Sequence, residues 1–402
     1  MFSALHTLIV GAAAMLDADP KIPTTIKRFA ALGDSYATGV GAGLELDPNC
    51  WKFSDSYPAQ LSRADIYNGS NPEIQFLACS GTVMRSNWVQ ASSRGGKKWK
   101  QIWEQIGAIE NADFVTLSVG GNDIGFFNVL NGCAYRFYGP ASPDCEKMLM
   151  MAKKKIKSNE FALTYNQILD AILSKNTAKS FRVFVNGYSE FFDENLTSEC
   201  DIESLGYWVG YRPRLLKELR GEVNKICKGL NEKIGEIIEK RNDKRIVFVD
   251  WAPKFDSHRF CRPGGGLMDG DTWFYDATFR SANLDLIDPK MCGPESQANP
   301  GDWGAQALCA IAFTHEQYPG LQPAIPRDVQ PAGGRQPFGP GDARLFHPTP
   351  EGHKAIVDTI LEAWPYTAAE DWPVSNDMDN DNNDGDEDGE DEDDGWYGDV
   401  IG

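Results

Sequence analysis

Four short motifs along the chain contain residues that could take part in catalysis: a serine hydroxyl, a glycine, an asparagine carboxamide and histidine imidazoles. They are residues 33–36 (GDSY), 79–81 (CSG), 120–123 (GGND) and 347–353 (HPTPEGH). A serine hydroxyl is a poor nucleophile until a base removes its proton, and histidine suits that role near neutral pH. Together these residue types predict acyl transfer through Ser35, with a late histidine as the base.

Acyl transfer also needs hydrogen-bond donors, because its tetrahedral intermediate carries an oxyanion. The backbone N–H groups of Ser35 and Gly81 and the side-chain amide of Asn122 would supply three donors. Glycine at position 81 lets the backbone approach a substrate closely. An aspartate in place of Asn122 would repel the oxyanion, so the carboxamide favours this interpretation.

Each motif alone has an ordinary structural explanation, as a turn or, for His353, as a residue at a helix start. The combination is more specific, because the first three motifs follow predicted strands. Five apolar runs, each followed by a turn signal, are predicted to form strands: residues 29–32, 74–78, 114–119, 181–185 and 246–249. Near-continuous hydrophobicity is typical of parallel strands covered on both faces.

Helical patterns lie between these strands, at residues 98–109, 161–173 and 215–240. The alternation predicts a doubly wound α/β sheet, in which ligands bind beyond the carboxyl ends of the strands. Residues 261–340 are rich in glycine and proline and are expected to form long loops that shape a site. Residues 356–364 are predicted to form a closing helix. Aromatic residues 273–275 fit either an acyl pocket or loop packing.

The four motifs, in this order, resemble the conserved blocks of the GDSL, or SGNH, hydrolase superfamily, in particular its secreted bacterial and fungal esterases and lipases. Residues 29–36 (FAALGDSY) are similar to the first block, which implies that Ser35 is the nucleophile. Gly81 and Asn122 match the second and third blocks, whose donors complete the oxyanion hole. His347 matches the catalytic base of the last block.

The resemblance spans about residues 28–364. It implies a three-layer α/β/α (flavodoxin-like) sandwich with a five-stranded parallel sheet and long loop insertions, acting without a cofactor. By the same analogy, Cys50 with Cys79 and Cys133 with Cys145 are expected to form disulfides, and a bridge from Cys200 to Cys261 is a further candidate.

One position departs from the family pattern. The family places an aspartate three residues before the base, and here that residue is Arg344. A guanidinium cannot accept the imidazole N–H. Two replacements are open: the carboxylate of Asp342, or a backbone carbonyl between Arg344 and Phe346. We favour the carbonyl, because Asp342 is offset from the family position.

The nine cysteines and the amino-terminal segment bear on the compartment. No cysteine lies in a Cys-x-x-Cys pair or near a histidine at zinc-ligand spacing, so no metal site is expected. Long separations suit a disulfide framework formed in an oxidising compartment, with one thiol left over, and Cys292 and Cys309 could order the loop-rich stretch. Residues 5–16 resemble the apolar core of a secretory signal without a preceding basic residue, or else a plain surface segment. Sequons at Asn68 and Asn195 would permit glycosylation after export.

The charge is concentrated at the carboxyl terminus. The formal net charge is −19, and residues 376–402 contain 13 acidic residues and no basic ones, which leaves −6 on the rest. The acidic balance argues against nucleic acid or an anionic membrane as the main partner. Residues 384–389 imitate a calcium loop, but position twelve is Gly395 rather than glutamate, so a disordered acidic tail is expected.

These observations predict a secreted, monomeric serine esterase without a transmembrane segment. The expected organisation is a signal or pro segment at residues 1–27, a hydrolase domain at 28–365 and an acidic tail at 366–402. The substrate is a small-molecule, lipid or polysaccharide ester, with a modest preference for acyl-lipid esters. The alternatives are a carbohydrate acetylesterase on the same scaffold and a catalytically dead binding protein, the latter motivated by Arg344.

Overall fold

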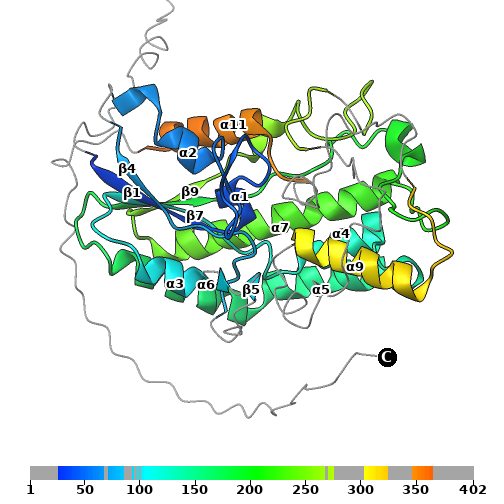
Figure 1. Cartoon of the computed structure of the whole chain (residues 1–402). Helices are drawn as coiled ribbons and strands as arrows, with labels where there is room; N and C mark the ends of the chain where they lie inside the picture. Colours follow the sequence, from blue (N-terminus) through cyan, green and yellow to red (C-terminus); the bar gives the residue numbers. More distant parts are fainter. Residues whose placement is uncertain are drawn as a thin grey trace, which may run out of the picture. The chain divides into compact units, whose positions relative to one another are not determined.

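The computed structural model describes residues 26–67, 71–85, 93–94, 97–98, 101–267, 270–275, 303–324 and 346–364. Its centre is a parallel sheet of five strands in the order β4-β1-β7-β8-β9 (Figure 1). The strands are β1 (Arg28–Gly33), β4 (Glu73–Phe76), β7 (Phe114–Ser118), β8 (Arg182–Asn186) and β9 (Ile246–Val249). The five predicted strands are therefore present, and the predicted fold class is confirmed.

The strand order creates a crevice beside β1. The chain passes from β1 to β4 on one side of it and then returns to β7 on the other side. In doubly wound sheets this reversal opens a gap at the carboxyl ends of the strands, where ligands bind. The ends of β1 and β7 are aligned, with Gly33 opposite Ser118. Residues that follow these two strands therefore lie at the same edge of the sheet.

Helices cover both faces of the sheet. On one side, α11 (Pro350–Glu362) packs on α2 (Tyr57–Leu61), and Figure 1 draws both above the strands. On the other side lie α3 (Ile102–Gly107), α6 (Asn159–Leu173) and α7 (Lys217–Arg241), with α5 (Cys145–Lys157) packed on α7. The remaining described helices are α1 (Ser35–Thr38), α4 (Phe126–Leu130) and α9 (Trp303–Gln317).

Short elements complete the described chain. Two hairpins pair β2 (Glu45–Asp47) with β3 (Lys52–Phe53) and β5 (Ser93–Arg94) with β6 (Lys97–Lys98). Short 3-10 helices are η1 (Asp65–Tyr67), η3 (Gly139–Ala141), η4 (Ser198–Ile202) and η5 (Ala252–Phe255), and η2 (Asn131–Tyr135) is a short π-helix. None of the helices in the described ranges has the length and apolar character needed to cross a bilayer.

Three helix predictions differ from the structure. The helix predicted from residue 98 begins at Ile102, because Gln101 and Glu104 form a capping box there. The closing helix begins at Pro350, six residues earlier than predicted, since Thr349 caps it and proline is favoured at the first helical position. The stretch predicted to be loops contains α9, whose many apolar residues lack a clear amphipathic period.

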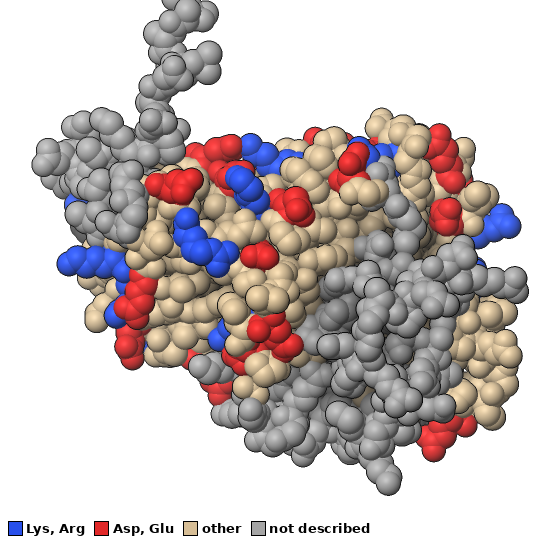
Figure 2. Space-filling view, turned by 45° about the horizontal axis from the view of Figure 1, so that its top comes forward, with Lys and Arg blue, Asp and Glu red and all other residues tan. Residues whose placement is uncertain are grey.

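Aromatic rings fill the core around the sheet. Phe29 of β1 stacks on Phe114 of β7 at a centroid distance of 4.7 Å, and Trp364 meets the Phe114 and Phe184 rings at 5.1 and 4.8 Å. Burying a large aromatic side chain contributes about 1.5–3 kcal/mol. Trp364 follows α11, so this packing fastens the helix that comes directly after residues 347–349. The face drawn in Figure 2 has acidic and basic side chains interspersed, in keeping with the mild charge outside residues 376–402.

Candidate active site

Ser35 occupies the first turn of α1, directly after β1. Gly33 has φ +133°, and a Cβ there would lie 2.2 Å from the Ser118 carbonyl oxygen, so only glycine allows this close strand end. The Asp34 carboxylate accepts a hydrogen bond from the Tyr36 N–H at 3.0 Å and caps the helix. The Ser35 side chain is 5% exposed at this sharp turn.

His347 brings its ring to this serine from the far end of the chain. Its Nε2 lies 2.7 Å from Ser35 Oγ, a hydrogen-bond distance between residues 312 positions apart. His347 is 1% exposed. The structure therefore brings the hydroxyl and the imidazole together, at a distance compatible with general-base activation of serine.

A second segment of chain supports the backbone around His347. Phe274 and Pro348 form an antiparallel bridge. The Tyr275 N–H donates to the His347 carbonyl at 3.0 Å, and the Thr349 N–H donates to the Trp273 carbonyl at 2.8 Å. Of the two explanations open for aromatic residues 273–275, loop packing therefore applies: their backbone pairs with the segment that carries His347.

The other histidine of the HPTPEGH motif lies away from the serine. His353 is fully buried in α11, and neither ring nitrogen has a hydrogen-bond partner among the described residues. Burial, with a smaller contribution from His347, lowers the pKa of His353 to about 3. Of the two histidines in the motif, the one whose ring lies within hydrogen-bond distance of Ser35 is therefore His347.

Gly81 and Asn122 lie in loops that contact each other. The Asn122 Nδ2 donates to the Thr82 carbonyl at 2.9 Å, which joins the turn after β4 to the turn after β7. Gly81 has φ +86°, in the left-handed region that favours glycine. Neither the Ser35 N–H nor the Gly81 N–H donates a hydrogen bond to any residue in the described ranges.

Gln105 joins the first and second motifs, a contact that the sequence did not reveal. Its Oε1 accepts from the Gly33 N–H at 2.8 Å, and its Nε2 donates to the Gly33 carbonyl at 3.1 Å and to Thr82 Oγ at 2.8 Å. The signal in the sequence was a glutamine at helical spacing from Ile102 and Ile106, and the structure shows all three buried on one face of α3. A buried polar side chain on an apolar helix face requires partners.

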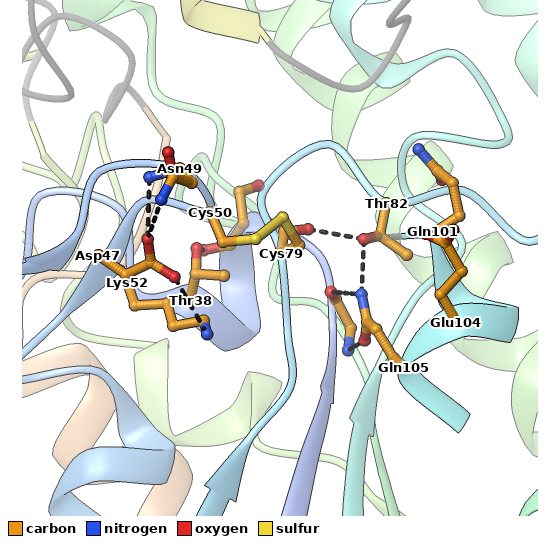
Figure 3. The surroundings of a disulfide bond; sticks show 12 residues. Thr38, Asp47, Asn49, Cys50, Lys52, Cys79, Thr82, Gln101, Glu104 and Gln105 are labelled. Atoms are coloured by element: carbon orange, nitrogen blue, oxygen red, sulfur yellow. Dashed lines mark hydrogen bonds and ion pairs between the residues drawn. A yellow bond between two sulfur atoms is a disulfide. The ribbon is translucent and has the colours of Figure 1, made fainter. Parts of the chain in front are cut away.

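The disulfide between Cys50 and Cys79 fastens the second motif from outside (Figure 3). Thr82 Oγ donates to the Cys79 carbonyl at 2.7 Å, and Figure 3 shows Thr82 between Cys79 and Gln105. The Cys79 N–H donates to the Gly33 carbonyl at 3.0 Å. These bonds fix the turn that holds Gly81 relative to the end of β1.

Tyr188, after β8, connects the first and third motifs. Its hydroxyl donates to Asp34 Oδ2 at 3.1 Å and accepts from the Gly121 N–H at 3.1 Å. Burial raises the pKa of Asp34 to about 7, although the bonds from Tyr36 N–H and Tyr188 act in the opposite direction. The carboxyl group of Asp34, the residue that precedes Ser35, therefore changes charge near neutral pH.

Asp123 is a second buried carboxyl group. Its Oδ1 accepts from the Met84 N–H at 2.9 Å, and Oδ2 has no hydrogen-bond partner in the part of the chain that the structure describes. Burial raises its pKa to about 7, against the lowering effects of the Met84 N–H and Lys155. The Asp123 carboxyl thus braces the loop that follows Asn122.

A small cavity touches both Ser35 and Asn122. Its apolar wall is formed by Phe126, Phe191, Cys227 and Leu230. The Cys227 thiol is free and buried, and burial raises its pKa, so it stays protonated and unreactive. The cavity has room for about one water molecule, so its apolar wall borders Ser35 without forming a pocket for an acyl chain.

Disulfides join the three pairs that the resemblance implies, Cys50–Cys79, Cys133–Cys145 and Cys200–Cys261. Cys309 is disulfide-bonded too, and Cys292 lies outside the described residues. Among the side chains described, no group of three or more histidine, cysteine or acidic residues could hold a metal ion.

The group that would orient His347 is only partly visible. Asp342 and Arg344 lie outside the described residues. Phe346, at the end of the predicted carbonyl range, has φ +61°, and its carbonyl accepts a hydrogen bond from the Tyr36 hydroxyl at 2.7 Å. The choice between Asp342 and a carbonyl stays a prediction.

Comparison with known proteins shows which family and which relatives the chain is similar to. Residues 31–275 match the model of the GDSL-like Lipase/Acylhydrolase family. The chain is similar to a protein named "Lipase" from Streptomyces rimosus, with 26% identity over 278 residues, covering 68% of this chain and 85% of that protein.

Two crystal structures share the fold. One is an extracellular lipase from Streptomyces rimosus and the other a phospholipase A1 from Streptomyces albidoflavus NA297. Each has a TM-score of 0.51 and 20% identity, and the similarity covers 84% of this chain and 99% of the other. Both similarities extend over nearly the whole of the other protein.

Proposed function

The chain belongs to the GDSL-like Lipase/Acylhydrolase family, and on that premise we propose that it hydrolyses carboxylic esters through an acyl-enzyme on Ser35. The observation that carries the proposal is the 2.7 Å distance between Ser35 Oγ and His347 Nε2. His347 is the general base and then the general acid. Each half-reaction uses the same two side chains.

In the first half-reaction, Ser35 Oγ forms a bond to the ester carbonyl carbon while its proton passes to His347 Nε2. The carbonyl π electrons move onto oxygen and produce the oxyanion. When the intermediate collapses, the bond to the alcohol oxygen breaks, and His347 gives its proton to the departing alkoxide. A water molecule then repeats the sequence on the acyl-enzyme and restores Ser35.

The oxyanion is stabilised by the N–H groups of Ser35 and Gly81 and by the amide of Asn122. The two main-chain groups donate no hydrogen bond within the described residues, which supports this role. The bond to Thr82 fixes the plane of the Asn122 amide. Each such donor contributes about 2.7–4 kcal/mol to transition-state stabilisation.

The substrate is an acyl-lipid or small acyl ester. The side chains of Phe126, Phe191 and Leu230 near Ser35 are apolar, which favours an acyl group over a hydroxyl-rich sugar. The similarity to a protein named "Lipase" supports the same choice. A preference for acetylated sugars would instead identify a carbohydrate acetylesterase.

The proposal extends to the compartment and to the organisation of the chain. Three disulfides in the described residues support secretion, since disulfides persist in oxidising compartments. Residues 1–27 would act as a signal or pro segment, 28–365 as the hydrolase domain and 366–402 as an acidic tail. The enzyme would act as a monomer without a cofactor, and exposed Asn195 would be available for glycosylation.

The experiment combines turnover with covalent labelling. The purified chain is assayed on p-nitrophenyl esters of increasing chain length and on acetylated sugars, and is treated with a serine-directed phosphonate. Turnover with stoichiometric label on Ser35, and loss of both in Ser35→Ala, supports the proposal. No label and no turnover would identify a binding protein on a dead scaffold.

A further inference from the structure

We propose that Tyr36 is a positioning residue that holds His347 against Ser35 by donating a hydrogen bond to the Phe346 carbonyl. The inference rests on the proposed function, because it concerns the base of that reaction. The contact appears only when the two ends of the chain are placed together.

Two adjacent residues of α1 contact two adjacent residues of the base segment. Ser35 Oγ lies 2.7 Å from His347 Nε2, and the Tyr36 hydroxyl lies 2.7 Å from the Phe346 carbonyl oxygen. The Phe346 carbonyl and the His347 nitrogen belong to one planar peptide unit. Fixing that oxygen therefore fixes the plane from which the His347 side chain projects.

The donor is itself held rigidly. Tyr36 is 5% exposed, and its ring packs at 5.2 Å against both the His347 ring and the Tyr188 ring. Its backbone N–H is bonded to Asp34. Burial raises the pKa of the Tyr36 hydroxyl, so the group stays protonated and donates at every working pH.

The acceptor needs such support. Phe346 is a non-glycine residue with φ +61°, a conformation that local preference disfavours for a bulky side chain. Its ring is packed among aromatic neighbours, including Phe191 at 4.6 Å and Phe260 at 5.3 Å. Packing determines where the ring lies, and the hydrogen bond from Tyr36 determines how the following peptide is turned.

The other contacts of the base segment run to a different partner. The backbone bonds from Tyr275 and Thr349 join it to residues 273–275, which do not carry the nucleophile. Tyr36 joins it to the helix that begins with Ser35. This second connection bears directly on the distance between the base and the hydroxyl that it serves, because it joins a residue next to Ser35 to a residue next to His347.

The test removes one oxygen atom. Tyr36→Phe keeps the ring and deletes the donor. Tyr67→Phe is the matched control, because Tyr67 is 7% exposed and its hydroxyl has no hydrogen-bond partner within the described ranges. For wild type and both variants, kcat and KM on p-nitrophenyl butyrate, the rate of phosphonate labelling and the melting temperature are measured on the full chain.

Small misplacements of a catalytic group cost about 10²-fold in rate. We expect Tyr36→Phe to lower kcat and the labelling rate together by about 10- to 100-fold, with KM nearly unchanged and Tyr67→Phe like wild type. The proposal is overturned if Tyr36→Phe keeps kcat and labelling within about twofold of wild type, or if it unfolds below the assay temperature. If the wild type were inactive, the proposed function would be refuted. If the wild type were active and Tyr36→Phe were equally active, only the role of Tyr36 would be refuted.

Discussion

His353 offers a quantitative test of the buried interior behind the active site. The residue is fully buried, its two ring nitrogens have no hydrogen-bond partner among the residues described, and its pKa is lowered to about 3. In the unfolded chain its pKa returns to about 6.5. Between these values the unfolded state binds a proton that the folded state does not, so lowering the pH favours unfolding.

The magnitude follows from the two pKa values. At pH 5 the unfolded histidine is almost fully protonated and the folded one is not, which destabilises the fold by about 2 kcal/mol relative to pH 8. His353→Leu, a substitution of similar volume, removes this contribution. The stability advantage of the variant over wild type should therefore grow by about 2 kcal/mol between pH 8 and pH 5.

Asp34 and Asp123 change stability with the opposite sign. Their pKa values are raised to about 7, so the folded state binds their protons between about pH 4 and 7, and stability falls as the pH rises through that range. Both carboxyl groups are present in wild type and variant. The difference between the two proteins therefore isolates His353.

The measurement is urea unfolding at pH 5 and pH 8 with the disulfides intact, followed by tryptophan fluorescence. Ester hydrolysis by the same samples is the control, and His353→Leu should keep it while His347→Ala abolishes it. An unchanged pH dependence in His353→Leu would contradict the lowered pKa. Loss of activity in His353→Leu, with activity retained in His347→Ala, would show that the base had been misidentified.

Three further predictions concern the site and its supports. Asn122→Ala should lower kcat about 10²- to 10³-fold with little effect on KM. Asn122→Asp should lower kcat at least as much, because a carboxylate repels the oxyanion. If steady-state assays gave both variants the kcat of the wild type, Asn122 would not be part of the oxyanion hole. Asp342→Ala should retain most activity if a carbonyl orients His347, whereas activity as low as in His347→Ala would reinstate Asp342 as the third member. Replacing Cys50 and Cys79 by alanine opens a loop with a sequence separation of 29 and should cost about 3 kcal/mol of stability in urea titrations; a change near zero would mean that Gly81 is held by hydrogen bonds alone.

The sequence alone predicted the structural features that depend on residues close together in the chain. The five apolar runs specify parallel strands because both faces of each strand must be buried. Ser35, Gly81 and Asn122 follow three of those strands, so the sheet places them at one edge. The boundaries of α3 and α11 were less accurate, because capping by Gln101 and Thr349 decides them within a single turn.

Contacts between distant residues were decided by the tertiary structure. A motif with two histidines does not say which ring reaches the serine; burial of His353 and the 2.7 Å approach of His347 answer that question. The bonds from Gln105 to Gly33 and from Tyr36 to Phe346 join segments 72 and 310 positions apart. Local preferences fix which groups are available, whereas the packing of the whole sheet and its helices fixes which of them come within hydrogen-bond distance.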